Sequence, residues 1–261
     1  QISLMCGIYG IASFKANGPN LADIKAMGEI LKNRGPDDNG TYYDECVAFG
    51  HNRLSIIDLS KRGRQPMRNE TGSLWITFNG EIYNYRELRN SLKGEHHFAS
   101  DTDTEVILHA YEEMGEDLWP QLQGMFAFAI WDREQRTVHM VRDQFGIKPL
   151  FYAIVDGALI FASQMKGVLA APQVDVRYKP QGISDFFSYF FVPSPGTGIE
   201  NVHQVGAGEA FRFSSGGLER HTYYRLRPQI QPSLTEKEIL EELPIRLREA
   251  VDKAIISDVP V

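Results

Sequence analysis

The residue best suited to chemistry is a cysteine near the start of the chain. The run Met5-Cys6-Gly7-Ile8-Tyr9-Gly10 places its thiol directly after a methionine and at the head of a short apolar segment. If the backbone began at Cys6, the free α-amine could take the thiol proton, so one residue would supply both nucleophile and base. Such a pair suits the cleavage of an amide. A cysteine in an apolar run can also be a buried structural residue, so other polar residues must decide.

Two segments place polar groups next to apolar runs. Asn79-Gly80 follows the mainly apolar residues 74–78. This pair is typical of a tight turn, but an asparagine amide and a glycine N–H can also stabilise the oxyanion of a tetrahedral intermediate. Arg53, in the run His51-Asn52-Arg53-Leu54-Ser55, has a planar guanidinium that can bind a carboxylate or form a structural ion pair.

Two further segments have mainly structural interpretations. The run Ser100-Asp101-Thr102-Asp103-Thr104-Glu105 is foremost an N-terminal signal of a helix, and it could also present the Asp103 carboxylate to an ammonium group. The charged residues 142–150 are interpreted as an architectural connection between strands.

The composition excludes several classes of function. With 261 residues, of which 43% are hydrophobic, the chain can form one large domain or two small ones. A net charge of -7 and a pI near 5.5 do not indicate binding to nucleic acid or to an anionic membrane. Two cysteines, Cys6 and Cys46, argue against a disulfide framework, and no signal peptide or membrane-length apolar stretch is visible, so we expect a cytoplasmic protein.

No metal site is expected from the histidines. Among seven histidines, His96 and His97 are the only close pair. Neighbouring residues on a helix or strand point to different faces, which is a poor geometry for two ligands of one ion.

Short strands and helices must position the polar residues. Strands are predicted at 7–14, 40–43, 46–57 in two pieces, 74–78, 125–131, 137–141, 150–155 and 158–161. Helices are predicted from Asn20, as the N-cap, to about Lys32, with Leu21, Ile24, Met27 and Leu31 on one face, then at 84–92 and from Asp103 onwards. Because short turns join adjacent strands, the strands must pair antiparallel, and the predicted fold is an α+β sandwich.

The last part of the chain has the pattern of a linker and a helix. Residues 226–232 are rich in Pro, Gln and Arg and are predicted to be a linker. Ser233 or Thr235 can then cap a helix, which Pro244 is predicted to kink or restart. Its apolar stripe consists of Leu240, Leu243, Leu247, Val251 and Ala254. Because such a stripe needs a partner, we expect 233–261 to be the first helix of a further, truncated domain.

Taken together and in this order, the polar segments resemble the glutaminase domain of glutamine-hydrolysing asparagine synthetases. This domain is a class II glutamine amidotransferase and an N-terminal-nucleophile hydrolase. The segments that carry the resemblance are Cys6-Gly7-Ile8, Arg34-Gly35-Pro36-Asp37, His51-Asn52-Arg53-Leu54-Ser55, Asn79-Gly80-Glu81, Thr102-Asp103-Thr104-Glu105 and residues 142–150. It covers about 5–225, and 233–261 resemble the first helix of the synthetase domain. It implies a four-layer αββα sandwich, with two antiparallel sheets between helices.

The resemblance also implies a role for each matching residue. Cys6 would be the nucleophile with its own α-amine as base, and the Asn79 side chain and Gly80 N–H would hold the oxyanion. Arg53 would bind the α-carboxylate of L-glutamine, and Asp103, with Glu81 beside it, would bind the ammonium. The complete expected substrate-binding set is Arg53, Leu54, Ile57, Asn79, Gly80, Glu81 and Asp103.

The larger reaction that the resemblance implies involves a second domain. Glutamine would be hydrolysed to glutamate and ammonia, and the ammonia would pass to a synthetase domain that uses ATP and magnesium, whereas the glutaminase domain needs no cofactor or metal. Residues 215–220 imitate a pyrophosphate loop, but Glu219 and Arg220 replace its Asp-Ser, so a hairpin is predicted. The implied partners are L-glutamine and the chain's own synthetase domain, with a homodimer as a further candidate and no nucleic acid or membrane.

The sequence departs from the family pattern at two places, and two alternative functions remain possible interpretations. Met5 still precedes Cys6, and residues 1–4 are interpreted as an expression remnant, so activity is expected to require removal of all five. Gln164 stands where similar proteins usually have Glu. One alternative is an amidotransferase of the same architecture with another acceptor, such as a surface-polysaccharide sugar. The other is an inactive glutamine-sensing or dimerisation module.

Overall fold

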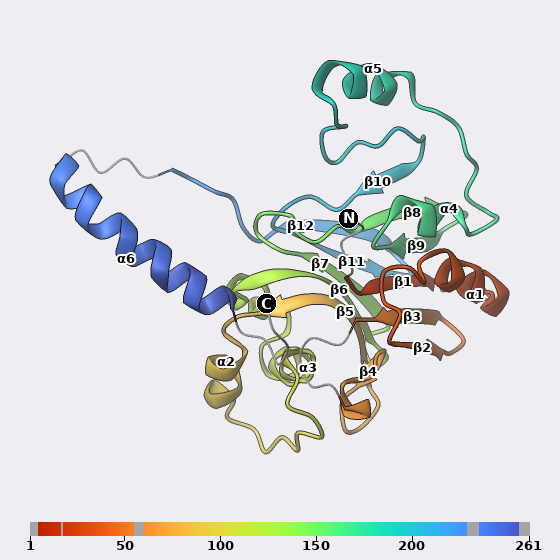
Figure 1. The fold of residues 1–261 in the computed structure, drawn as a ribbon. Helices are drawn as coiled ribbons and strands as arrows, with labels where there is room; N and C mark the ends of the chain where they lie inside the picture. The colour runs from red at the N-terminus through yellow and green to blue at the C-terminus, as the bar shows by residue number, and fades with distance from the viewer. Residues whose placement is uncertain (1–4, 17, 55–59, 229–234, 256–261) are drawn as a thin grey trace.

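The chain forms two stacked antiparallel sheets with helices on their outer faces (Figure 1). The computed structural model describes residues 5–16, 18–54, 60–228 and 235–255. The first sheet has the strand order β10 (Val202–Gln204), β8 (Phe151–Val155), β9 (Ala158–Ala162), β1 (Gly7–Ala12), β3 (Val47–Arg53) and β2 (Asp38–Tyr43). The second has the order β12 (Gly217–Thr222), β11 (Glu209–Ser214), β7 (Thr137–Arg142), β6 (Gly124–Asp132), β5 (Leu74–Ile82) and β4 (Met67–Arg68).

Three apolar cores hold the layers together. The helices are α1 (Leu21–Ile30), α2 (Tyr85–Ser91), α3 (Asp103–Met114), α4 (Met165–Leu169), α5 (Pro180–Tyr189) and α6 (Glu236–Ala254), with short 3₁₀ turns at η1 (Lys61–Gly63) and η2 (Gly115–Gln121). Side chains on β1 alternate between cores, with Ile8 between the sheets and Tyr9 against α1 and α4. A third core joins the second sheet to α2 and α3. The predicted α+β sandwich with four layers is confirmed.

Helix α1 shows how local sequence sets an outer layer. The Asn20 side chain accepts a hydrogen bond from the Ala22 N–H and caps the helix, as predicted. Ile24, Met27 and Leu31 are fully buried against the first sheet. Leu21, predicted on the same face, is 40% exposed, because the contact with the sheet starts one turn later.

Strand β5 is longer than its apolar run predicts. It continues through Asn79 and Gly80, which pair with Ala127 and Phe126 of β6, so this pair is not a turn. A Cβ on Gly80 would lie 2.2 Å from the Met125 carbonyl oxygen, so only glycine permits the close approach of the two strands. The expected strand pieces at 46–57 are one strand, β3, and residues 55–59 lie outside the described part.

The C-terminal part agrees with prediction in its helix cap and its hairpin. Strands β11 and β12 form a tight hairpin with Ser214 opposite Gly217, as predicted for 215–220. Thr235 caps α6 through a reciprocal capping box with Glu238. The helix runs through Pro244 without a restart, and none of its residues is buried. Among the described helices, none has both the length and the apolar character of a membrane span.

Candidate active site

Most of the predicted site residues meet at one end of the two sheets. The heads of β1 and α3 and the ends of β3 and β5 come together there, and the sheets are tied to each other by the Thr77 hydroxyl, which donates to the Gly50 carbonyl at 3.1 Å. The predicted residues that line the common pocket are Cys6, Arg53, Leu54, Asn79, Gly80, Glu81 and Asp103. Ile57 lies outside the described residues.

Cys6 is held by contacts on both sides of its backbone and at its thiol. The antiparallel register pairs Gly7 with Asn52, which places Cys6 next to Arg53. The Leu54 N–H donates to Cys6 Sγ at 3.4 Å, and the Arg34 Nε donates to the Cys6 carbonyl at 2.9 Å. Burial raises the pKa of the thiol, against the lowering effects of the Leu54 N–H and of the Arg53, Lys148 and Arg34 charges. The resting thiol is therefore protonated, and an attack by sulfur needs a base.

Arg34 has a positioning role that its motif did not reveal. Its carbonyl accepts the Met5 N–H at 3.0 Å while its guanidinium holds the Cys6 carbonyl, so it fixes the backbone on both sides of the Met5–Cys6 bond. Gly35 permits this arrangement, since a Cβ there would lie 2.2 Å from the Asn52 carbonyl oxygen.

Beyond its pairing with β4, β5 has an unpaired edge that presents backbone donors to the pocket. In an antiparallel strand the N–H groups alternate between the two sides. The Phe78 N–H donates to Gln65 Oε1 at 2.6 Å and the Ile82 N–H donates to Asp103 Oδ2 at 2.9 Å, both away from β6. Gly80, midway between them, directs its N–H to the same edge.

The side chain of Asn79 adds a second donor to this edge. Asn79 is 2% exposed, and its Nδ2 has no hydrogen-bond partner among the described residues. A buried amide donor without an acceptor is costly, because water cannot reach it. The pocket thus holds two N–H donors, from Asn79 and Gly80, that can receive a single oxygen atom.

Two residues outside the predicted set fix this edge. The Gln65 side chain accepts from the Phe78 N–H and donates to Thr104 Oγ1 at 3.3 Å, which links β5 to α3. His51 Nε2 lies 3.0 Å from the Phe78 carbonyl. Burial lowers the pKa of His51 to about 4, so the ring is neutral and donates through Nε2. Both residues act through a peptide distant in sequence, and no local pattern identifies them.

Asp103 is a fully buried carboxyl at the N-terminus of α3. Burial raises its pKa to about 7, and this effect outweighs the hydrogen bonds from the backbone N–H groups of Ile82 and Thr104. Nearby Glu81 also has a raised pKa because of burial. A cation placed between these two carboxyl groups would stabilise their charged forms.

Lys148 is a pocket residue that was not predicted. Its ammonium lies 3.5 Å from Met5 Sδ, and its charge opposes the raised pKa values of both Cys6 and Glu81. The backbone of Lys148 is fixed by Asp143, which accepts its N–H at 3.0 Å, and by Arg142, which donates to its carbonyl at 2.7 Å. The architectural interpretation of 142–150 therefore holds for Arg142 and Asp143.

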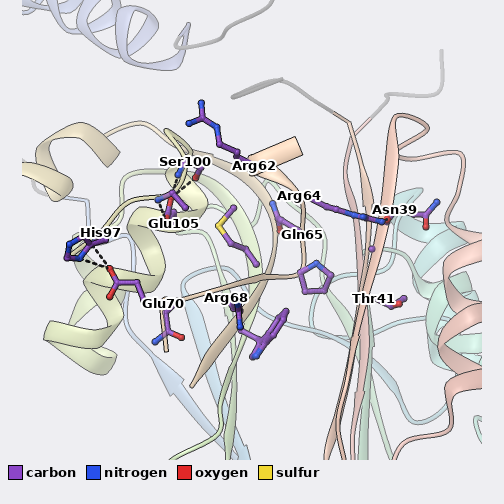
Figure 2. A pocket seen from close by; sticks show the side chains of 16 residues that line it. Asn39, Thr41, Arg62, Arg64, Gln65, Arg68, Glu70, His97, Ser100 and Glu105 are labelled. Atoms are coloured by element: carbon purple, nitrogen blue, oxygen red, sulfur yellow. Dashed lines mark hydrogen bonds and ion pairs between the residues drawn. The ribbon is translucent and has the colours of Figure 1, made fainter. Parts of the chain in front are cut away.

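A larger cavity lies beside the pocket but lacks the nucleophile (Figure 2). It has a volume of about 620 Å³, against about 50 Å³ for the pocket at Cys6, and the two share Gln65 as a wall. Arg62, Arg64 and Arg68 line it together with Glu105. We place the chemistry in the smaller pocket, because only there do a thiol and unpaired amide donors converge.

Residues 5–224 match the family of glutamine amidotransferase domains. The chain belongs to that family. The family expected from the order of the polar segments is thus confirmed, and this glutamine amidotransferase domain includes every residue of the pocket. Gln164 lies at the N-cap of α4, away from the pocket lining, and nothing in the structure explains its departure from Glu.

Two relatives in Bacillus subtilis are named glutamine-hydrolysing asparagine synthetases. Asparagine synthetase 1 is 38% identical over 264 residues, which cover 98% of this chain and 41% of the relative. Asparagine synthetase 3 is 34% identical over 262 residues, which cover 98% of this chain and 42% of the relative. The chain therefore spans about two fifths of the length of these relatives.

The fold is also found in a solved structure of lower sequence similarity. Glutamine phosphoribosylpyrophosphate amidotransferase from B. subtilis matches with a TM-score of 0.61 at 18% identity, over 84% of this chain and 49% of that chain. This likeness concerns the fold, and it agrees with the predicted stack of two sheets between helices.

Proposed function

We propose that this domain, with its backbone beginning at Cys6, hydrolyses L-glutamine to glutamate and ammonia. The observation that carries the proposal is the buried, unpaired Asn79 amide in the same pocket as the Cys6 thiol. An oxyanion hole explains why such a donor is left unpaired, whereas an inactive module gives no reason for it. The family membership supports the same reaction.

The proposed mechanism uses groups of this chain alone. The α-amine of Cys6 takes the thiol proton as Sγ attacks the side-chain carbonyl carbon of glutamine, and the oxygen moves between Asn79 Nδ2 and the Gly80 N–H. The ammonium then protonates the departing nitrogen, which leaves as ammonia, and a thioester remains. Water, deprotonated by the same amine, cleaves the thioester to glutamate and restores the thiol.

The two ends of the substrate's amino-acid group orient it for this attack. Arg53, at the end of β3, would bind the α-carboxylate, and Asp103 with Glu81 would bind the ammonium. Lys148 would favour the thiolate as the proton leaves. Leu54 would contribute through its backbone, because its N–H already contacts Cys6 Sγ.

The Met5–Cys6 bond provides the test. With Met5 attached, the Cys6 nitrogen is an amide and cannot act as a base. A chain that begins at Cys6 should release glutamate from glutamine and be alkylated at Cys6 by a glutamine-like electrophile, and the same chain with Met5 retained should do neither at a comparable rate. Cys6→Ala is the control for background hydrolysis. Equal glutaminase activity with Met5 in place would overturn the proposal.

The use of the ammonia concerns the part of the longer relatives that this chain does not cover. We propose that it is supplied to an ATP-dependent synthetase domain in a full-length protein, probed by adding aspartate, ATP and magnesium to the Cys6-terminal chain. The chain that begins at Cys6 should release ammonia without forming pyrophosphate, because the tight β11–β12 hairpin occupies the place of the imitated pyrophosphate loop. Formation of asparagine and pyrophosphate would contradict this assignment. A cytoplasmic location, a homodimer and the domain boundaries stay predictions.

A further inference from the structure

Two imidazoles and a carboxylate converge at α3, outside the lining of the Cys6 pocket. His109 and Glu112 lie three residues apart on α3 and therefore share one face of the helix. His96 approaches from the segment between α2 and α3. One ligand atom from each residue lies within 4.8 Å of the others.

The distances show which atoms face the centre of this cluster. His109 Nδ1 lies 2.7 Å and His96 Nδ1 lies 3.6 Å from the same oxygen, Glu112 Oε2. The ring centroids are 4.6 Å apart. In a tetrahedral zinc site with bonds of about 2.0 Å, ligand atoms are separated by about 3.3 Å, so shifts below about 1 Å would bring these two pairs to that spacing.

The outward-facing atoms lie near a second layer of polar groups. His96 Nε2 lies 2.9 Å from Glu113 Oε1, and His109 Nε2 lies 3.9 Å from Glu105 Oε1. The remaining oxygen of the central carboxylate, Glu112 Oε1, accepts from Asn69 Nδ2 at 2.7 Å. A carboxylate behind each imidazole is the arrangement that orients histidine ligands in metal sites.

Burial and charge also favour a cation at this place. The side chain of His109 is 1% exposed, its Nε2 has no hydrogen-bond partner among the described residues, and the ring of Phe98 packs on it at a centroid distance of 4.7 Å. Three carboxylates, from Glu105, Glu112 and Glu113, surround the two rings. A divalent ion would require neutral imidazoles as ligands, and its charge would then offset this excess of negative charge.

We propose that His96, His109 and Glu112 bind a divalent transition-metal ion, foremost zinc. Two imidazole nitrogens and one carboxylate oxygen match zinc, cobalt and nickel, whereas magnesium and calcium prefer oxygen ligands alone. The side chain of Glu112 is 28% exposed, so water can occupy a fourth position. The ion would fasten the segment around His96 to α3, the helix whose first residue is Asp103.

The sequence predicts no metal site, but that prediction is based only on the pair His96 and His97. The structure separates these neighbours, since the side chain of His97 is 88% exposed and pairs with Glu70. The partners of His96 are 13 and 16 positions away in the sequence and become neighbours only when the segment folds against α3.

Cobalt(II) titration of the metal-free protein tests the proposal, followed by displacement with zinc. We expect one equivalent to bind with a dissociation constant of 10 µM or tighter, to give the intense visible bands of a four-coordinate ion, and to raise the melting temperature. His96→Gln and Glu112→Gln should each weaken binding at least tenfold. His97→Gln, one residue away, is the matched control and should bind as the unsubstituted protein does.

Three outcomes would overturn the proposal. Binding weaker than 100 µM would show that the cluster is a hydrogen-bonded network of protonated imidazoles. Equal affinity in the His96→Gln and unsubstituted proteins would place the ion elsewhere. A sulfur-to-cobalt charge-transfer band that disappears in Cys6→Ala would assign the ion to the thiol of the active-site pocket.

Discussion

The buried amide of Asn79 gives a direct prediction at the scale of single residues. Replacement of Asn79 by Ala removes one oxyanion donor, and we expect kcat for glutamine hydrolysis to fall about 10²- to 10³-fold. The KM should change little, because the donor acts on the oxygen after attack has begun. Steady-state kinetics of the chain that begins at Cys6 would measure both constants. A variant with normal kcat and a raised KM would instead place Asn79 in ground-state binding.

The raised pKa of Asp103 predicts an unusual effect of pH on stability. The folded carboxyl has a pKa of about 7, above the usual value of 3.8, so its ionisation disfavours the folded state. The cost is absent below pH 4, where folded and unfolded forms are both protonated, and grows as pH rises to about 7. Asp103→Asn should therefore raise the melting temperature at pH 8 by several degrees, and the gain should vanish near pH 4.

The same substitution should impair glutamine binding. The amide introduced by Asp103→Asn would keep an oxygen for the Ile82 N–H but would lack the charge for the ammonium, so we expect at least a tenfold loss of affinity, or about 1.4 kcal/mol. Isothermal titration with the Cys6→Ala protein separates binding from turnover. An Asp103→Asn protein with normal affinity and higher stability would show that the carboxyl does not contact the substrate.

The sequence predicted residues that the structure brings together in one pocket. Cys6, Arg53 and Asp103 line it, and each was selected as a charged or reactive group within a compact motif. Gln65 and His51 were missed, because they act on the Phe78 peptide, 13 and 27 positions away. Which distant residues share a peptide is decided by the pairing of strands and sheets, and a linear pattern does not contain that information.

At the scale of elements, Pro244 is the residue of α6 that conflicts with its surroundings. It has no N–H for the Leu240 carbonyl and lies inside a continuous helix. Pro244→Ala should restore this hydrogen bond and slow amide exchange over residues 241–254, with a gain in local helix stability of up to about 3 kcal/mol. Hydrogen exchange read by mass spectrometry would measure it, with Arg248→Ala as the control. Unchanged exchange rates would mean that the proline does not limit the stability of this helix.

The elements also show where patterns succeed and fail. Apolar runs bounded by turn residues predicted most of the strands, and β1, β3 and β7 are buried along their whole length. The pattern ended β5 too early, because pairing with β6 overrides the turn preference of Asn79-Gly80. Helix α5 was not predicted at all. Its large side chains, including Phe187 and the adjoining Phe190, are 76% and 85% exposed, so the usual apolar stripe gives no guide there.

For the whole molecule, the exposed stripe of α6 predicts self-association. Leu240, Leu243, Leu247 and Val251 are 50–63% exposed. Contiguous apolar surface of this kind favours contact with a second copy. Sedimentation velocity at increasing concentration should show oligomers, and the double substitution Leu240→Glu with Leu247→Glu should shift the protein towards the monomer without changing glutamine hydrolysis.

The large apolar side chains of α5 form a second exposed surface, which could mediate association in place of α6. If Phe187→Ser abolishes association and the α6 double variant does not, the contact belongs to α5. A chain that stays monomeric at all concentrations would show that neither surface suffices. The layered fold could be predicted as a whole, but these surfaces could not be ranked, since their burial depends on partners rather than on the chain itself.

The contacts around Cys6 would keep this residue rigid even if it were the first residue of the chain. Terminal residues usually fray, because nothing ties them down. Cys6 instead heads β1, which lies between β3 and β9, and Arg34 holds its carbonyl. An α-amine on this residue would lose most of its rotational freedom during folding, before any glutamine arrives. The sheet would thereby give a terminus the rigidity that enzymes ordinarily obtain from side chains in their interior.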